Sequence, residues 1–106
     1  MASLSTHVLD TAAGQPAAGL RVTVESADGT ALAAGVTDHD GRVGDLAGDL
    51  PVGDLRIRFD TGAWFAAHGT DTFYPEVVVA FTVTRDEHFH VPLLLSPFGY
   101  STYRGS

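Results

Sequence analysis

The chain has 106 residues, of which 44% are apolar and 18% are charged, and these values predict one globular domain spanning residues 1–106. Its formal charge is −7, from thirteen acidic residues against six arginines, and it contains neither Cys nor Lys. The acidic balance argues against binding to nucleic acid or to an anionic membrane surface. The missing residue types exclude disulfides, thiolate nucleophiles and lysine Schiff bases.

No segment approaches the ~20 consecutive apolar residues of a membrane-spanning helix. The start of the chain also lacks the basic and apolar regions of a signal peptide. The sequence therefore predicts a cytoplasmic protein. Any anionic ligand would be bound by guanidinium, imidazole or backbone N–H groups, because no ammonium side chain is present.

Strand patterns dominate the first half of the chain. Residues 4–10 alternate weakly and residues 20–26 alternate cleanly between apolar and polar side chains. Asp28-Gly29 predicts a hairpin turn that returns the chain along residues 31–37. The turn-rich segment 11–19 and the segment 44–53 are predicted to be loops, with room for a short strand near Val43.

The second half contains one exception to the strand pattern. Residues 63–68, closed by Gly69, predict about two turns of helix. Strands are predicted at 54–60, 77–83, 88–95 and 100–104. Seven or eight short strands with one short α-helix indicate an all-β protein, an antiparallel β-sandwich with Greek-key character.

Strand parity places two histidines on outer faces of the predicted sandwich. Side chains along a strand alternate between its two faces. In the strand 88–95 the core face holds the aromatic and aliphatic residues at 89, 91, 93 and 95, so His88 and His90 point away from it. In the strand 4–10 the core face holds Leu4, Thr6 and Val8, so His7 points outward. First and last strands often neighbour one another in such sandwiches, and we therefore expect His7 and His90 to lie on one surface.

The same surface carries the apolar residues Leu9, Pro92 and Leu94. An outer sheet face with apolar residues usually contacts another protein surface. We therefore expect a subunit interface with imidazoles embedded in it, where histidine can serve as a general acid or base.

The sequence gives less support to metal binding, to a serine nucleophile and to phosphate binding. His88 and His90 have a spacing that can chelate zinc, but the absence of Cys and of further clustered ligands argues against a metal site, and none is expected. Arg42, after Asp40-Gly41, is by default a turn arginine paired with an aspartate. There is no Ser-His-Asp arrangement, Gly-x-Ser-x-Gly elbow or Gly-rich phosphate loop, so hydrolysis by an activated water stays open.

The C-terminal residues Tyr103-Arg104-Gly105-Ser106 follow a dense apolar strand without a spacer. They supply a phenol, a guanidinium, a hydroxyl and a carboxylate. Such a tail is either a frayed end or part of a site.

Five segments in chain order resemble the 5-hydroxyisourate hydrolases, a transthyretin-like family acting in the second step of urate breakdown. They are residues 4–10, residues 37–42, residues 59–62 together with 73–76, residues 88–97, and residues 100–106. Each segment alone is a weak signal, whereas all of them in order across nearly the full length are highly specific.

The resemblance implies a transthyretin-like sandwich assembled as a homotetramer, with sites in a channel at the dimer–dimer interface. It implies a cofactor-free hydrolysis of 5-hydroxyisourate to 2-oxo-4-hydroxy-4-carboxy-5-ureidoimidazoline. Carried over to this sequence, the catalytic residues are His7, Arg42, His90 and Ser106. The substrate-binding residues are Arg42, Tyr103, Arg104 and Gly105.

In this scheme Arg42 binds substrate oxygens and stabilises the oxyanion. One of His7 and His90 activates water, and the other orients it or protonates the leaving nitrogen; the sequence does not decide which. Ser106 would hold a histidine or the substrate, and Tyr103 would line the pocket. Two alternatives remain: a transthyretin-like carrier of a small ligand, and a structural or adhesion sandwich without a site.

Overall fold

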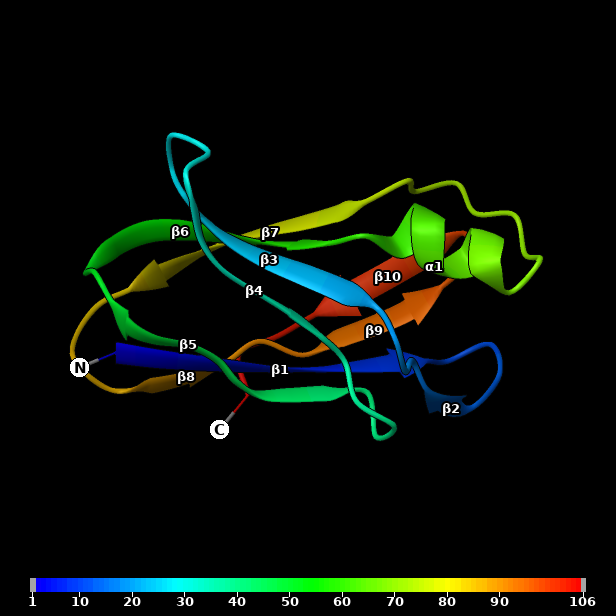
Figure 1. Cartoon of the computed structure of the whole chain (residues 1–106), viewed down its shortest axis with the longest axis horizontal. Coiled ribbons are helices and arrows are strands. Elements are labelled where there is room, and N and C mark those ends of the chain that lie inside the picture. The colour runs from blue at the N-terminus through cyan, green and yellow to red at the C-terminus, as the bar shows by residue number, and fades with distance from the viewer. Residues whose placement is uncertain (1, 106) are drawn as a thin grey trace.

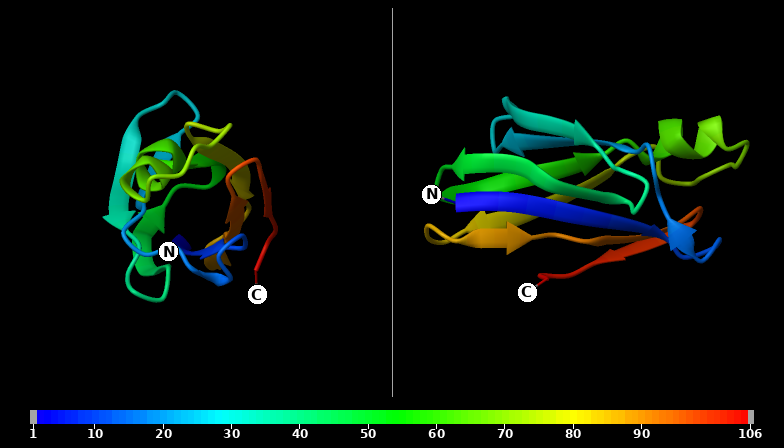
Figure 2. Two further views of the ribbon diagram at one scale, coloured as in Figure 1. Left: turned by 90° about the vertical axis from the view of Figure 1, so that its right-hand side faces the viewer. Right: turned by 60° about the horizontal axis from the view of Figure 1, so that its bottom comes forward.

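A computed structural model describes residues 2–105 (Figure 1). The elements are β1 (Ala2–Asp10), β2 (Gln15–Pro16), β3 (Arg21–Ser26), β4 (Ala31–Val36), β5 (Arg42–Leu50), β6 (Gly53–Phe59), α1 (Thr61–Ala67), β7 (Val77–Val83), β8 (His88–His90), β9 (Leu93–Ser96) and β10 (Gly99–Thr102). The strands form two layers that face one another, which confirms the predicted all-β sandwich with one short helix (Figure 2).

Strand β1 is the centre of the first sheet. The order of this sheet is β10-β9-β1-β2, and β5 and β8 also pair with β1, whereas the second sheet has the order β4-β3-β6-β7. The pairing of β1 with β8 and β9 is parallel, while all its other pairings are antiparallel. The first sheet is therefore mixed, which the antiparallel prediction did not include. The predicted adjacency of the first strand and the strands near the end of the chain is confirmed.

The core lies between the two sheets and follows the predicted alternation. In β1, Leu4 and Val8 have no exposed surface, and Thr6 is buried with its hydroxyl donating to the Val91 carbonyl at 2.6 Å. In β6, Ile57 and Phe59 are fully buried. Burying such a side chain stabilises the fold by roughly 1.5–3 kcal/mol relative to leaving it exposed. These alternating contacts fix which face of β1 is turned outward.

The segment 44–53 is largely a strand, and its prediction as a loop is wrong. Strand β5 runs from Arg42 to Leu50 and pairs with β1, with two register shifts along the pair. Glycine and aspartate disfavour strands, and these residues dominate positions 44–49. Asp49 has a left-handed φ of 63°. Pairing with β1 and burial of Leu46 and Leu50 override the weak local preference.

The predicted strand 88–95 is interrupted. Val91 and Pro92 lie between β8 and β9, outside both strands, and Pro92 has no backbone N–H to donate. Pro92 is buried, so the expectation that it forms part of an exposed apolar face is wrong. Leu94 and Leu9 are partly exposed, as expected. The short strand β2 lies within the segment predicted to be turns.

Helix α1 begins two residues earlier than predicted and lies at the end of the sandwich opposite the start of β1 (Figures 1 and 2). Gly69 follows it with a φ of 66°, the left-handed conformation expected of a helix stop. Trp64 and Phe65 are buried, and the Trp64 indole donates to the Ala18 carbonyl at 2.7 Å. Within residues 2–105, no helix has the length and apolarity needed to cross a membrane.

Candidate active site

The polar face of the first sheet brings together side chains from three strands. His7 on β1 lies directly opposite Arg42 on β5, and Ser5 on β1 lies opposite His90 on β8. Because residues two apart on a strand share a face, Ser5 and His7 point to the same side of β1. Three catalytic candidates, His7, Arg42 and His90, therefore share one outward face.

A pocket of about 250 Å³ lies on this face. It is lined by Ser5, Thr6, Arg42, Gly44, His88 and His90. Its groups include a guanidinium, two imidazoles and a hydroxyl, so it offers hydrogen-bond donors and titratable bases to a small polar ligand.

His7 is held by a backbone carbonyl. Its Nε2 lies 2.9 Å from the Asp40 oxygen, and a carbonyl only accepts hydrogen bonds, so Nε2 carries the hydrogen. In the neutral ring the lone pair is consequently on Nδ1. Strand β1 and the turn before β5 thus fix both the orientation and the tautomer of His7.

The turn before β5 positions Arg42. The Asp38 carboxylate accepts hydrogen bonds from the backbone N–H groups of Asp40 and Arg42, each at 2.9 Å. The hydrogen bond from Arg42 is the main cause that lowers the pKa of Asp38. Gly41, with a φ of 76°, would place a Cβ only 2.3 Å from the Val8 carbonyl oxygen, so this turn requires glycine.

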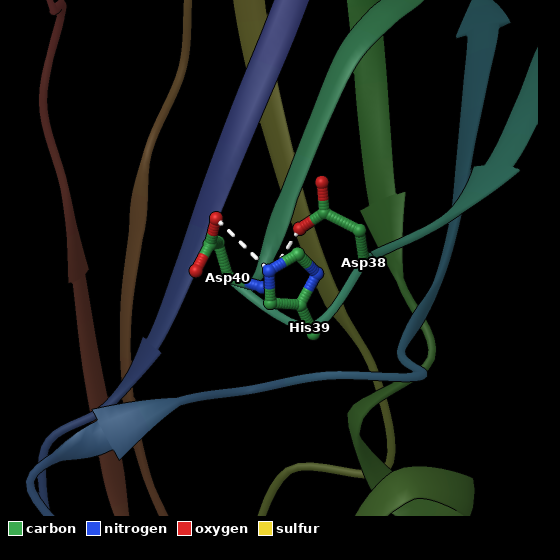
Figure 3. A group of neighbouring side chains, drawn as sticks. All are labelled: Asp38, His39 and Asp40. Atoms are coloured by element: carbon green, nitrogen blue, oxygen red, sulfur yellow. Dashed lines mark hydrogen bonds and ion pairs between the residues drawn. The ribbon is translucent and has the colours of Figure 1, made fainter.

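Asp38, His39 and Asp40 also form a cluster of ligand-type atoms that lie within 4.8 Å of one another (Figure 3). All three side chains are exposed, and the Asp38 carboxylate is engaged by the turn backbone. His39 Nε2 lies 3.5 Å from an Asp40 carboxylate oxygen. These contacts explain the cluster as turn structure that holds Arg42.

The surroundings of His90 lower its affinity for a proton. Burial lowers its pKa below the ordinary 6.5, and electrostatic interaction with His7, Arg42 and His88 lowers it further. Its Nδ1 lies 2.7 Å from the Ser5 hydroxyl. Neutral imidazole is therefore the main form of His90 near pH 7, which is the form that can accept a proton.

The described part of the tail is attached to β8 and is not a frayed end. The Gly105 N–H donates to the His90 carbonyl at 2.8 Å. Arg104 forms an ion pair with Glu87 at 2.8 Å and stacks over the Phe89 ring at 4.9 Å. Tyr103 is 58% exposed and, with Arg104 and His90, lines a second pocket of about 270 Å³.

The structure thus gathers most of the predicted site residues around His90. His7 and Arg42 lie near His90, and the Gly105 N–H donates to the His90 carbonyl. Tyr103 and Arg104 line a different pocket that His90 also borders, and Ser106 lies outside the described residues. Sequence reasoning did not identify Ser5, which bonds to His90. The polar alternation of Ser3, Ser5 and His7 was the available signal.

The chain matches the HIUase/Transthyretin family over residues 4–105. It is 50% identical to the 5-hydroxyisourate hydrolase of Caulobacter vibrioides, with all of both chains covered. Among solved structures, it resembles the 5-hydroxyisourate hydrolase of Klebsiella pneumoniae, with a TM-score of 0.91 and 40% identity over 98% of this chain and 99% of that one. It also resembles sea bream transthyretin in complex with thyroxine, with a TM-score of 0.90 and 34% identity over 97% of this chain and 94% of that one. These similarities over the full length show that this chain belongs to the HIUase/Transthyretin family.

Proposed function

We propose that the protein is a hydrolase that opens the ring amide of 5-hydroxyisourate in urate breakdown, giving 2-oxo-4-hydroxy-4-carboxy-5-ureidoimidazoline. The observation that carries the proposal is the outer-face pocket formed by Arg42 and His90 beside His7, in a chain half identical to a 5-hydroxyisourate hydrolase over its full length. The reaction requires a bound planar heterocycle, an activated water and a stabilised oxyanion. The pocket contains groups suited to each of these tasks.

Arg42 is the group that binds the substrate. Its planar guanidinium donates to carbonyl oxygens and is always protonated, so it stabilises negative charge as water attacks the carbonyl carbon. The hydrogen bond from the Arg42 backbone N–H to the Asp38 carboxylate fixes the position of the backbone that carries this side chain. Tyr103, Arg104 and Gly105 are proposed to bind substrate from the tail.

His7 and His90 share the proton transfers. The attacking water gives a proton to one imidazole, and the nitrogen that leaves the carbonyl carbon takes up a proton from the other or from the same ring. The lowered pKa of His90 leaves it neutral and able to accept the proton. Ser106 is proposed to hold a histidine or the substrate.

A homotetramer is proposed as the active assembly, with sites at the dimer–dimer interface. Large apolar side chains are exposed on β7 and on the C-terminal segment, where Val78, Tyr100 and Tyr103 lie, and exposed apolar groups favour contact with another subunit. Light scattering should give four times the chain mass of 11.1 kDa. A monomer at working concentration would contradict this assembly. A cytoplasmic location and one domain over residues 1–106 remain predictions from the sequence.

The test uses 5-hydroxyisourate generated in the cuvette from urate by urate oxidase, with its spontaneous decay as the baseline. The protein should accelerate the decay, and His7→Ala and His90→Ala should each lower kcat by roughly 10²–10⁴-fold, as loss of a general acid or base does. His68→Ala, an exposed histidine at the end of α1, is the matched control. Near-full turnover by both site variants would refute the scheme. Binding without any turnover would favour the carrier alternative.

A further inference from the structure

Two serines and two histidines form a regular array on the outer face beside the pocket. Ser3 and Ser5 are two residues apart on β1, and His88 and His90 are two residues apart on the parallel strand β8. The register pairs Ser3 with His88 and Ser5 with His90. All four side chains therefore share one face.

Hydrogen bonds connect the array into a single chain of groups. Ser3 Oγ lies 2.6 Å from His88 Nδ1, His88 Nε2 lies 2.9 Å from Ser5 Oγ, and Ser5 Oγ lies 2.7 Å from His90 Nδ1. Ser5 is 8% exposed, whereas His88 is exposed. This series of hydrogen bonds therefore connects the exposed ring of His88 to Nδ1 of His90.

The Ser5 hydroxyl couples the two rings because it has one hydrogen. It donates to one imidazole nitrogen and must accept from the other. In the first arrangement His90 carries its hydrogen on Nδ1 and leaves a lone pair on Nε2, the form of a base. In the second arrangement every hydrogen bond reverses, and His90 carries its hydrogen on Nε2, the form of an acid.

We propose that Ser3, His88 and Ser5 form a proton relay that converts His90 from its base form to its acid form during each turnover. The inference rests on the proposed hydrolase function and assigns His90 as the group that takes the proton of the attacking water. Ser5 and His88 are positioning residues, because they act through His90.

Every proton that moves in this step has a donor and an acceptor. The attacking water gives one proton to His90 Nε2, and its oxygen forms the new bond to the carbonyl carbon. His90 Nδ1–H passes its proton to Ser5, Ser5 passes its own to His88 Nε2, and His88 Nδ1–H passes its proton to Ser3, from which one proton leaves to solvent. His90 ends neutral with Nε2–H. As the carbon–nitrogen bond breaks, Nε2–H protonates the leaving nitrogen while Ser5 returns a proton to Nδ1, so the ring stays neutral. Protons returning along the same path restore the first arrangement.

The surroundings of His90 favour such a relay over a charged intermediate. The ionisable groups that face His90 are His7 from β1, Arg42 from β5 and His88 from β8, and Tyr103 and Arg104 from the tail share its second pocket. Glu87 offsets the charge of Arg104 through their ion pair. Burial and the electrostatic effect of His7, Arg42 and His88 lower the pKa of His90, so a doubly protonated ring is unfavourable. The relay moves a proton through the ring without charging it.

The first test removes the hydroxyl that joins the two rings. Ser5→Ala should lower kcat by roughly 10²-fold, because without the hydroxyl His90 no longer exchanges protons with His88 and its acid–base role is impaired. Ser5→Thr keeps the hydroxyl and should restore most of the rate. Ser26→Ala, which removes a hydrogen-bonded serine at the distant β3–β4 turn, is the control and should keep wild-type kcat.

The second test distinguishes proton transfer through His88 from a hydrogen bond that only holds Ser5 in place. His88→Gln keeps a group that can hydrogen-bond to Ser5, but an amide does not exchange protons between its oxygen and nitrogen as an imidazole does. The relay predicts that His88→Gln lowers kcat as Ser5→Ala does. Wild-type kcat in His88→Gln, or a change confined to KM, would overturn the relay. His88 is exposed, so this variant should fold even if Ser5→Ala does not.

The third test needs no substrate. Nitrogen-15 NMR of the imidazoles should show His90 averaged between two tautomers in the wild type and confined to one in Ser5→Ala. An unchanged His90 spectrum in the variant would overturn the coupling. A wild-type protein that shows this coupling but does not turn over 5-hydroxyisourate would refute the hydrolase function instead, so the two failures are distinguishable.

Discussion

Gly105→Ala is expected to inactivate the enzyme by displacing the imidazole of His90. A Cβ at position 105 would lie 2.5 Å from His90 Cδ2, 3.1 Å from Cγ and 3.2 Å from Cβ. Carbon atoms in contact prefer about 3.5–4.0 Å, so the ring or the tail must move by about 1 Å. Both alternatives alter the site, because the Gly105 N–H also holds the tail on the His90 carbonyl at 2.8 Å.

The size of the effect follows from the size of the displacement. Misplacing a catalytic group by about 1 Å costs roughly 10²-fold in rate. We therefore expect kcat for 5-hydroxyisourate to fall by about two orders of magnitude, with little change in thermal stability, because the neighbouring tail residues Tyr103 and Arg104 are exposed. The decay assay measures kcat, and thermal unfolding of the same samples measures stability.

Gly99→Ala is the matched control in the same C-terminal segment. Its Cβ would meet only Ser96 Oγ, at an ordinary contact distance of 3.6 Å, so wild-type kcat is expected. Wild-type kcat in Gly105→Ala would refute the argument that close packing of the tail sets the position of His90. Equal losses in both variants would refute it as well, because they would indicate a general effect on the C-terminal segment.

Three further changes test the site and the fold. Asp38→Ala removes the acceptor for the Arg42 backbone N–H and should raise KM or lower kcat by about tenfold; retention of both values would show that the turn does not position Arg42. His90 has a lowered pKa, so the unfolded chain binds more protons than the folded one as the pH falls below 6.5, and stability should decline there; stability that rises on acidification from pH 7 to 6 would contradict the sign. The value of kcat should decline at a lower pH, where His90 of the folded protein becomes protonated. Phe59→Ala should destabilise the fold by roughly 3–5 kcal/mol in chemical denaturation because Phe59 is fully buried between the sheets, and a loss below 1 kcal/mol would contradict its core position.

Local patterns predicted the parts of the fold that local forces determine. The alternation of Leu4, Thr6 and Val8 fixed the buried face of β1, and Gly69 marked the end of the helix correctly. The segment 44–53 was missed because its glycines and aspartates carry no strand preference, and pairing with β1 supplies the order instead. Tertiary contacts thus override local propensity at β5.

Local patterns likewise predicted only those features of the candidate site that do not depend on contacts between distant segments. Parity placed His7 and His90 on outer faces, since parity depends only on neighbouring residues. Ser5 was missed because its role depends on the register between β1 and β8, which joins residues 85 positions apart. No pattern within either strand encodes that register. The hydrogen bond from His7 to the Asp40 carbonyl likewise depends on how the turn before β5 is folded.

The position of β1 has a consequence for biosynthesis. Its longer partners are β5, β8 and β9, and the last two are made after strands β1 to β7 and helix α1. Until they leave the ribosome, the edge of β1 that pairs with β8 and β9 is unpaired, and its backbone N–H and C=O groups are open to chaperones or to aggregation. The first sheet and the His90 environment both require β8, so a nascent polypeptide that stalls before β8 has neither a complete fold nor a catalytic centre.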